Sequence, residues 1–196
     1  PPANDDCANA QAIVCGLPGT CPANQIVGTT LAAVEETFPA IPDPACNTGN
    51  ISDVWYKFTT GTTTTEIEVN LEYLSATMVG VELFSACGAG NAIVGTCVSD
   101  GGAATPMTFT VTPSTTYRLR VFTNYDTQNP GTYKLCVQKK PSPPVNDDIC
   151  GAIDLPIYQT LPVMTSGTNF YATQSPQAAM SCGSHARDVW YKVTVP

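Results

Sequence analysis

The segment DVWYKFT at residues 53–59 constrains the fold of this chain most strongly, because it returns as DVWYKVT at residues 188–194. A match of this length that includes a tryptophan and a tyrosine is too specific to arise by chance. A second match, NDDC at 4–7 against NDDIC at 146–150, marks the start of each copy. The sequence therefore indicates two copies of one unit.

The spacing of the two matches gives the size of the unit. The DVWYK segments start 135 positions apart and the NDD segments 142 positions apart; the difference is the length of CGLPGTC at 15–21, which the second copy lacks. A unit of about 140 residues is longer than a solenoid repeat and can bury its own core. We predict a first domain at 1–139, a proline-rich linker at 140–145 and the first part of a second domain at 146–196. Because the second copy is incomplete, we expect the chain to be a piece of a longer polypeptide.

Charge and cysteine content indicate where the protein works. The net charge of −8 argues against nucleic acid and against an anionic membrane surface as partners, since both attract basic faces. No apolar run approaches the ~20 residues of a transmembrane helix, so we expect no membrane insertion. Nine cysteines at irregular spacings, with His185 as the only histidine, favour disulfides over zinc. We therefore expect a secreted protein, extracellular or on the cell surface.

Alternating apolar and polar residues predict short β-strands. The strand at 53–59 places Val54, Tyr56 and Phe58 on one face and Trp55 on the other, which is typical of a central strand covered on both sides. No amphipathic helix of three turns is visible, and Gly, Pro and Asn separate the strands. The prediction is an all-β fold, an antiparallel β-sandwich of jelly-roll type, repeated in tandem with the second copy incomplete. Further strands are expected at 11–15, 25–32, 63–74, 78–87, 92–97, 107–112, 116–122 and 132–138, with a short helical turn over 6–12.

Eight of the nine cysteines are expected to form disulfides that stabilise the fold. Each copy has one cysteine beside the NDD turn and one ahead of DVWYK, so we predict a bond within each copy. One further bond would clip a turn between strands, and another would close a small Gly/Pro loop. The predicted pairs, each contributing about 2–4 kcal/mol, are Cys7–Cys46, Cys150–Cys182, Cys87–Cys97 and Cys15–Cys21.

Cys136 has no assigned partner. Parity places it on the face opposite Leu135 and Val137, so it is not expected to be a core thiol. It could be free, pair with a neighbouring chain or displace one of the predicted pairs, and sequence cannot choose among these connectivities.

Two acidic pairs at the start of the copies are candidates for a structural calcium ion, which prefers several carboxylate and carbonyl oxygens. They are Asp5, Asp6, Asp147 and Asp148. The alternative is that they cap a short helical turn and interact with its N-terminal dipole. No other cofactor is expected. Asp53 and Asp188 raise the same question, and each is expected to cap a strand entry or meet a backbone amide.

No catalytic residues are predicted, and we expect a protein that is not an enzyme. A Ser-His-Asp or Cys-His arrangement needs a histidine, and His185 is the only one. Paired glycosidase carboxylates are arithmetically possible through Glu66, Glu68, Glu72 and Glu82. The first three, however, lie at spacing two on an outward strand face, with no sign of a cleft.

Aromatic side chains could stack on sugar rings. Most of them fall on inward positions, so core packing is the expected role of Trp55, Tyr73, Tyr117 and Tyr133. Tyr125 and Asp126 are the pair most expected to be exposed. Residues that bind a ligand are otherwise unknown from the sequence.

Taken together, the motifs resemble a known domain family. The run from DVWYKFT through VELFSACG, with TPSTTYRLRVF and GTYKLCV, is similar to the bacterial pre-peptidase C-terminal (PPC-like) domain, in the tandem version of secreted and surface proteins of the Bacteroidetes lineage. In that version NDDC-x-x-A and a DVWYKF strand commonly occur together. The resemblance covers 1–139 and, as the first part of a second copy, 145–196. CGLPGTC departs from the family pattern.

The resemblance implies a jelly-roll β-sandwich, secretion, and a non-catalytic accessory or adhesive role, with calcium in some members. We expect from it a disulfide-stabilised structural or adhesive repeat segment of a large secreted or cell-surface bacterial protein, such as an adhesin, able to assemble into a filament or fibre. The expected partners are other copies or neighbouring repeats, and surface glycans or proteins. The alternative is an accessory carbohydrate- or protein-binding module of a secreted hydrolase.

Overall fold

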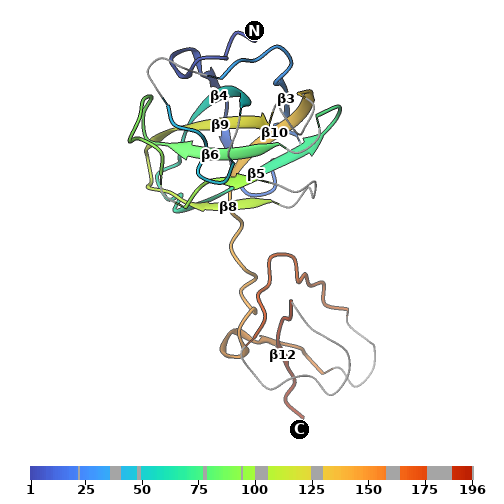
Figure 1. The fold of residues 1–196 in the computed structure, drawn as a ribbon. Coiled ribbons are helices and arrows are strands. Elements are labelled where there is room, and N and C mark those ends of the chain that lie inside the picture. The colour runs from blue at the N-terminus through green and yellow to red at the C-terminus, as the bar shows by residue number, and fades with distance from the viewer. Residues whose placement is uncertain are drawn as a thin grey trace. The chain divides into compact units, whose positions relative to one another are not determined.

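The computed structural model contains two compact units, Pro1–Lys140 (unit 1) and Pro141–Pro196 (unit 2), which are described separately (Figure 1). No helix within the described residues is long and apolar enough to cross a membrane. The structure describes residues 1–21, 23–35, 41–47, 50–76, 79–93, 95–99, 106–124, 130–157, 164–175 and 187–195.

Unit 1 contains two β-sheets. The strands of sheet A are β1 Gln11–Ala12, β4 Ile51–Thr59, β6 Gly80–Phe84, β7 Val98–Ser99 and β9 Thr116–Asn124, in the order β1-β4-β9-β6-β7. β4 and β9 pair antiparallel along their whole length, with Ile51 opposite Asn124 and Thr59 opposite Thr116. β6 and β7 continue the antiparallel pattern, whereas β1 pairs parallel with β4.

Sheet B is built around β10. Its strands are β2 Cys15–Gly16, β3 Ile26–Thr29, β5 Glu66–Tyr73, β8 Met107–Thr110 and β10 Thr132–Lys139, in the order β2-β10-β5-β8, and β3 also pairs with β10. β2 is parallel to β10 and the other pairings are antiparallel. A segment near the start of unit 1 and its last strand therefore lie side by side in this sheet.

The core lies between the two sheets, where the inward side chains of β4, β6 and β9 meet those of β5, β8 and β10. The hydroxyls of Tyr56 and Tyr133, one from each sheet, are hydrogen-bonded at 2.8 Å within it. Burial raises the pKa of both phenols. The predicted all-β sandwich and the inward parity of its strands are confirmed, with two short parallel pairings beside the antiparallel ones.

Sheet A carries a second apolar cluster on its outer face. Trp55 is fully buried there, with its ring 4.9 Å from that of Phe84 in an edge-to-face arrangement. Cys7 from the short helix η1 (Cys7–Asn9) and Ile41 pack into the same cluster. β4 is therefore covered on both sides, as the alternation in DVWYKFT predicts.

Residues 92, 93 and 95–97, the described part of the segment expected as a strand at 92–97, contain no strand, which corrects that prediction. Ala92 forms only an isolated bridge with Phe84, and the strand that follows is β7. The Thr96 hydroxyl donates to the carbonyl of Ile93 at 2.7 Å, and Gly95 has a φ of +81°. A left-handed residue and a side-chain hydrogen bond turn the chain here.

The described part of unit 2 has few regular elements. η2 spans Ile149–Gly151, and β11 (Ile153–Asp154) pairs parallel with β12 (Tyr191–Lys192). β12 is the middle of the DVWYKVT segment.

Candidate functional site

Three disulfides tie loops of unit 1 to distant segments. They join Cys7 to Cys87, Cys21 to Cys136 and Cys46 to Cys97, across 80, 115 and 51 positions of the chain. Cys136 replaces Cys15 as the partner of Cys21, which is the third of the alternatives for Cys136. The predicted pairs Cys7–Cys46, Cys15–Cys21 and Cys87–Cys97 are therefore wrong.

Strand parity explains the error at Cys15. In the β2–β10 pairing Cys15 lies opposite Val137, and both side chains pack with the core. Cys136 faces the other way, where the loop carrying Cys21 covers it, so Cys15 and Cys21 lie on opposite faces of sheet B. Cys15 is a free thiol whose pKa is raised by burial to about 11.

The outer face of sheet A explains the other two bonds. Cys87 packs against the cluster around Trp55, where Cys7 also lies. The amide of Cys46 donates to Sγ of Cys97 at 3.0 Å. Both bonds therefore fix the loops that cover Trp55. The only sequence feature that indicates this cover is a tryptophan at an outward strand position.

In unit 2, Cys150 is a free, exposed thiol. The predicted Cys150–Cys182 bond depends on Cys182, which lies outside the described residues. Cys7 and Cys46 hold the matching positions in unit 1 and are not bonded to each other.

A set of contacts around the NDD turn, here named the NDD clasp, holds three segments of unit 1 together. Nδ2 of Asn4 donates to the carbonyl of Trp55 at 2.9 Å, and the Trp55 amide donates to the Asn4 carbonyl at 2.8 Å. Oδ1 of Asp5 accepts from the amide of Val34 at 2.9 Å. Burial raises the pKa of Asp5, an effect that this hydrogen bond partly offsets.

The same contacts recur in unit 2. Asn146 and Trp190 exchange two hydrogen bonds at 3.0 and 2.8 Å, and Asp147 accepts from the amide and hydroxyl of Thr173 at 2.6 and 2.7 Å. The strand register recurs too: Gln11 lies opposite Tyr56 in β1–β4, and Ile153 lies opposite Tyr191 in β11–β12.

The loop gripped by the clasp is a third match, which sequence reasoning missed. GTTLAA at 28–33 corresponds to GTNFYA at 167–172. The hydroxyls of Thr29 and Thr168 each accept from the amide two residues on, and Ala32 and Tyr171 both have a left-handed φ, of +58° and +62°. A side chain at either glycine would meet the hydroxyl of Tyr56 or Tyr191. The only signal, G-T-x-x-x-A, is too short to be found without the structure.

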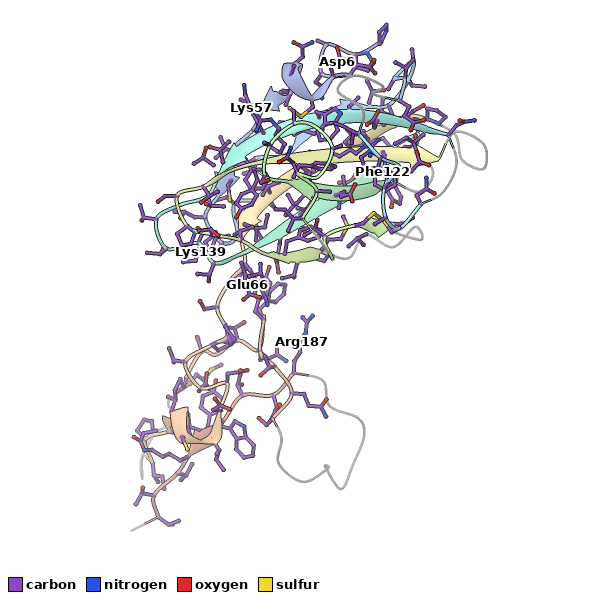
Figure 2. The ribbon with its side chains drawn as sticks, turned by 60° about the vertical axis from the view of Figure 1, so that its left-hand side comes forward. Asp6, Lys57, Glu66, Phe122, Lys139 and Arg187 are labelled. Atoms are coloured by element: carbon purple, nitrogen blue, oxygen red, sulfur yellow. A yellow bond between two sulfur atoms is a disulfide. The ribbon has the colours of Figure 1, made fainter. Side chains whose placement is uncertain are left out.

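The clasp changes the interpretation of the acidic pairs. Asp5 and Asp147 hold distant backbone amides rather than the adjacent helical turn. Asp6 and Asp148 precede η1 and η2 but make no side-chain capping hydrogen bond, so capping by these two residues is not found. Asp6 lies at the end of unit 1 away from Glu66 (Figure 2).

The fit of these aspartates to calcium is incomplete. Across the described ranges, no group of three or more His, Cys, Asp and Glu side chains could hold a metal ion. Described side chains alone thus do not supply the several oxygens that calcium prefers. Calcium at Asp5, Asp6, Asp147 and Asp148 stays a prediction, which thermal melting with and without a chelator would test. Asp188 accepts from the amide of Ser175 at 2.8 Å, as expected.

Arg120 is the centre of a buried polar cluster on the outer face of sheet A. Its Nε donates to Asp53 at 2.7 Å, one of its terminal nitrogens donates to the carbonyl of Pro42 at 2.8 Å, and Glu82 lies 4.0 Å away. Arg120 and Asp53 are fully buried. The hydrogen bond from Arg120 to Pro42 therefore holds the loop at 41–47 on sheet A. The Cys46–Cys97 bond holds the same loop covalently.

Two carboxyl groups beside this cluster have raised pKa values. Burial raises the pKa of Glu82, and the Arg120 charge and the Ala45 amide partly offset the effect. Burial and a hydrogen bond with Asp43 raise the pKa of Glu35. Glu35 also lines an open pocket of about 480 Å³, whose other walls are Ala32, Ala33, Val34, Asn50, Ile51 and Ser52.

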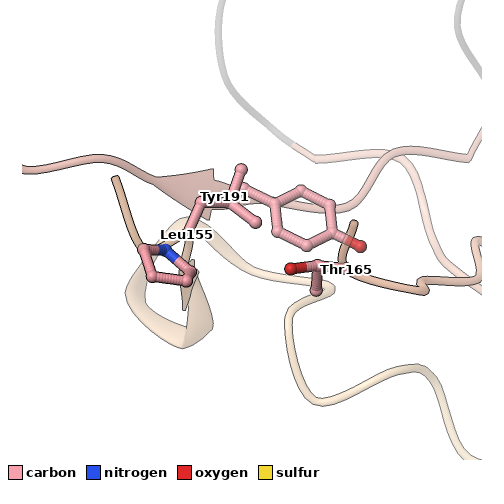
Figure 3. Close-up of a pocket in the computed structure, with 4 residues that line it drawn as sticks. Leu155, Thr165 and Tyr191 are labelled. Atoms are coloured by element: carbon pink, nitrogen blue, oxygen red, sulfur yellow. The ribbon is translucent and has the colours of Figure 1, made fainter. Parts of the chain in front are cut away.

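A second open pocket, of about 390 Å³, lies in unit 2 and is lined by Leu155, Pro156, Thr165 and Tyr191 (Figure 3). Tyr191 is half-buried, whereas Tyr56, its match in unit 1, is fully buried against Tyr133 of β10. The pocket is therefore lined by a tyrosine whose match in unit 1 is part of the core. For this reason we do not interpret the pocket as a ligand site.

The remaining candidate residues that the structure describes have structural roles. On the outer face of β5, Glu66 pairs with Lys140, Glu72 pairs with Lys134, and Glu68 accepts from Gln138. Trp55, Tyr117 and Tyr133 are buried and Tyr73 is half-buried, as expected for core packing. Tyr125, Asp126 and His185 lie outside the described residues.

The chain is similar to a solved structure and to a protein-family model. The chain is similar to the pre-peptidase C-terminal domain of collagenase from Bacillus anthracis, at 18% identity and a TM-score of 0.35, over 65% of this chain and 95% of that chain. No curated protein matches the chain. A family model described as "Galactose binding domain-like", GBD_T9SS_assoc, matches residues 3–135. Since this match runs from the NDD clasp into β10, the chain belongs to the T9SS-associated family of galactose-binding-domain-like domains.

Proposed function

We propose that the chain is a non-catalytic structural segment of a large secreted or cell-surface protein, in which domains of this family follow one another in tandem. The observation that carries the proposal is the recurrence of the NDD clasp in unit 2, with the same hydrogen bonds and strand register as in unit 1. These contacts join residues far apart in the chain, so they belong to a fold and not to a short motif. Two such folds in series suit a protein that spans distance.

Two further observations support an extracellular location. The family is associated with T9SS, which supports secretion. Three disulfides within unit 1 suit an oxidising compartment, where such bonds persist. Neighbouring repeats, other copies of the protein, and surface glycans or proteins are the partners that such a segment would contact as an adhesin or in a filament.

The carbohydrate-binding alternative has less support. Sugar recognition commonly uses an exposed aromatic ring, and Trp55, Tyr117 and Tyr133 are all buried. Among its described lining residues, the pocket beside Glu35 has no aromatic wall.

Antibodies against the purified chain test the location on intact cells and culture medium of the source bacterium. We expect signal on the cell surface or in the medium. Signal confined to lysed cells would contradict the proposal. A glycan array tests the alternative, because saturable binding there would favour an accessory carbohydrate-binding module.

A further inference from the structure

The Cys21–Cys136 disulfide joins the segment by which the chain enters unit 1 to the strand by which it leaves. Cys21 follows β2, and Cys136 lies in β10, the last strand before the unit ends at Lys140. The bond spans 115 positions. Both cysteines of the Cys46–Cys97 bond lie between Cys21 and Cys136 in the chain. This second bond therefore does not shorten the path from the entry of the chain to its exit.

The surrounding contacts align the entry and exit segments. β2 runs parallel to β10, with Cys15 opposite Val137 and Gly16 opposite Gln138. The amide of Cys21 donates to Oε1 of Gln138 at 3.1 Å. Because the strands are parallel, pulling the start of one against the end of the other acts along both strands and loads these hydrogen bonds together.

We propose that the Cys21–Cys136 bond carries tensile force past most of the β-sandwich of unit 1, so that a stretched chain transmits load through this domain without drawing out residues 21–136. A pull on the two ends passes along residues 1–21, through the disulfide and out along 136–140. Everything between Cys21 and Cys136 is outside the loaded path. The inference rests on the proposed function, since only a segment of a longer surface protein would experience such tension.

The insertion that distinguishes the two copies gives this bond its position. Cys21 is the last residue of CGLPGTC, which the second copy lacks. Unit 2 therefore has no cysteine at the matching place in its sequence. The two copies would differ in mechanical behaviour, because the insertion gives unit 1 a bond that limits how far it can extend.

Single-molecule force spectroscopy on the full chain tests the proposal. The chain is tethered at its N-terminus and, through an unnatural amino acid, at Ser142, an exposed residue of the linker. With the disulfides intact, the tethered segment should reach only about 90 Å at full extension, at roughly 3.6 Å per residue outside the closed span. After reduction it should reach about 500 Å on the same scale.

Variants separate this bond from the others. In C21S/C136S the Cys7–Cys87 bond becomes the shortest route, so the oxidised chain should reach about 220 Å at the same length per residue. C46S/C97S is the matched control and should stay near the wild-type length, because it removes a bond inside the closed span. If C21S/C136S does not fold, the oxidised wild-type length itself identifies the bond, because Cys7–Cys87 alone would allow about 220 Å.

Full extension of the oxidised wild-type chain, or no gain in C21S/C136S, would overturn the inference. Neither result bears on whether the protein is on the cell surface. The antibody experiment can therefore fail while this one succeeds, and the reverse.

Discussion

Arg120 lies over the ring of Trp55, with its guanidinium carbon 5.6 Å from the ring centroid, and both side chains are fully buried on the outer face of sheet A. The strand register produces this contact, because Trp55 and Arg120 are directly opposite in β4 and β9. Asp53 precedes Trp55 by two residues on the same strand face and meets the guanidinium at 2.7 Å. The charge of Arg120 is thus balanced at a site without solvent.

Replacing Asp53 with asparagine should lower the free energy of unfolding by about 3–5 kcal/mol, because Arg120 would remain buried without its charged partner. The double variant D53N/R120M should recover much of this loss, since an apolar side chain needs no counter-charge. Urea denaturation of the full chain, followed by tryptophan fluorescence, measures both changes.

Glu72→Gln is the matched control for this prediction. The ion pair of Glu72 with Lys134 is just as short, 2.8 Å, but both side chains are substantially exposed. Its loss should cost at most about 1 kcal/mol, because solvent screens such pairs. Equal losses in D53N and E72Q would show that burial of the Asp53–Arg120 pair is not what makes it important.

The two core tyrosines should respond unequally to loss of a hydroxyl. In Y56F the Tyr133 hydroxyl, which is fully buried, loses its partner, which should cost about 1–3 kcal/mol. In Y133F the Tyr56 hydroxyl keeps a hydrogen bond with Asn4, so the cost should be smaller. A double-mutant cycle in urea measures the coupling, and a larger loss in Y133F than in Y56F would contradict this assignment.

The sandwich could be predicted from the sequence because one face of each long strand packs on the core. Period-two alternation in DVWYKFT and in 63–74 encodes that face directly. Trp55 and Cys136 show where this reasoning stops. Both lie at outward positions, and both are buried, because loops from distant parts of the chain cover the outer faces of the sheets.

The disulfides and the Arg120 cluster could not be predicted for the same reason. Sequence neighbours suggested bonds within short segments, such as Cys87–Cys97 and Cys15–Cys21. The chain instead joins loops that tertiary packing brings together over the outer faces. Nothing local to Arg120 indicates that Pro42 meets it, because the loop at 41–47 has no periodic pattern that would place it over sheet A.

Cys15 should be nearly inert to alkylation in the folded protein, although it is a free thiol. Its side chain packs on the core, and with a pKa of about 11 roughly one thiol in a thousand is ionised at pH 8. Cys150 is exposed and should react with iodoacetamide under the same conditions. Mass spectrometry of the native and the denatured chain, without reduction, measures both. Native labelling of Cys15 at the rate of Cys150 would refute its core position.

Glu82 should make stability fall as pH rises. Burial raises its pKa in the folded state, so the folded protein binds this proton more tightly than the unfolded chain. The resulting stabilisation is fully present below the unfolded pKa of about 4.3 and is lost as pH rises through the folded value. E82Q should flatten the slope of unfolding free energy against pH above that unfolded value. E66Q removes one exposed charge as a control, and an equal flattening there would argue for net charge as the cause.

Ala32→Gly should stabilise unit 1, which is unusual for a substitution by glycine. Ala32 holds a φ of +58°, a left-handed conformation that costs an L-residue about 1–2 kcal/mol. Glycine adopts it freely but loses more entropy on folding, so the net gain should be at most about 1 kcal/mol. Ala12→Gly, in the exposed strand β1, is the control and should destabilise by about 0.5–1 kcal/mol, because it gains nothing in return. Thermal and urea unfolding of both variants measure the difference. Stabilisation by Ala32→Gly would show that the loop held by the NDD clasp keeps Ala32 in an unfavourable left-handed conformation, like that of Tyr171 in unit 2. Destabilisation equal to that of Ala12→Gly would contradict this.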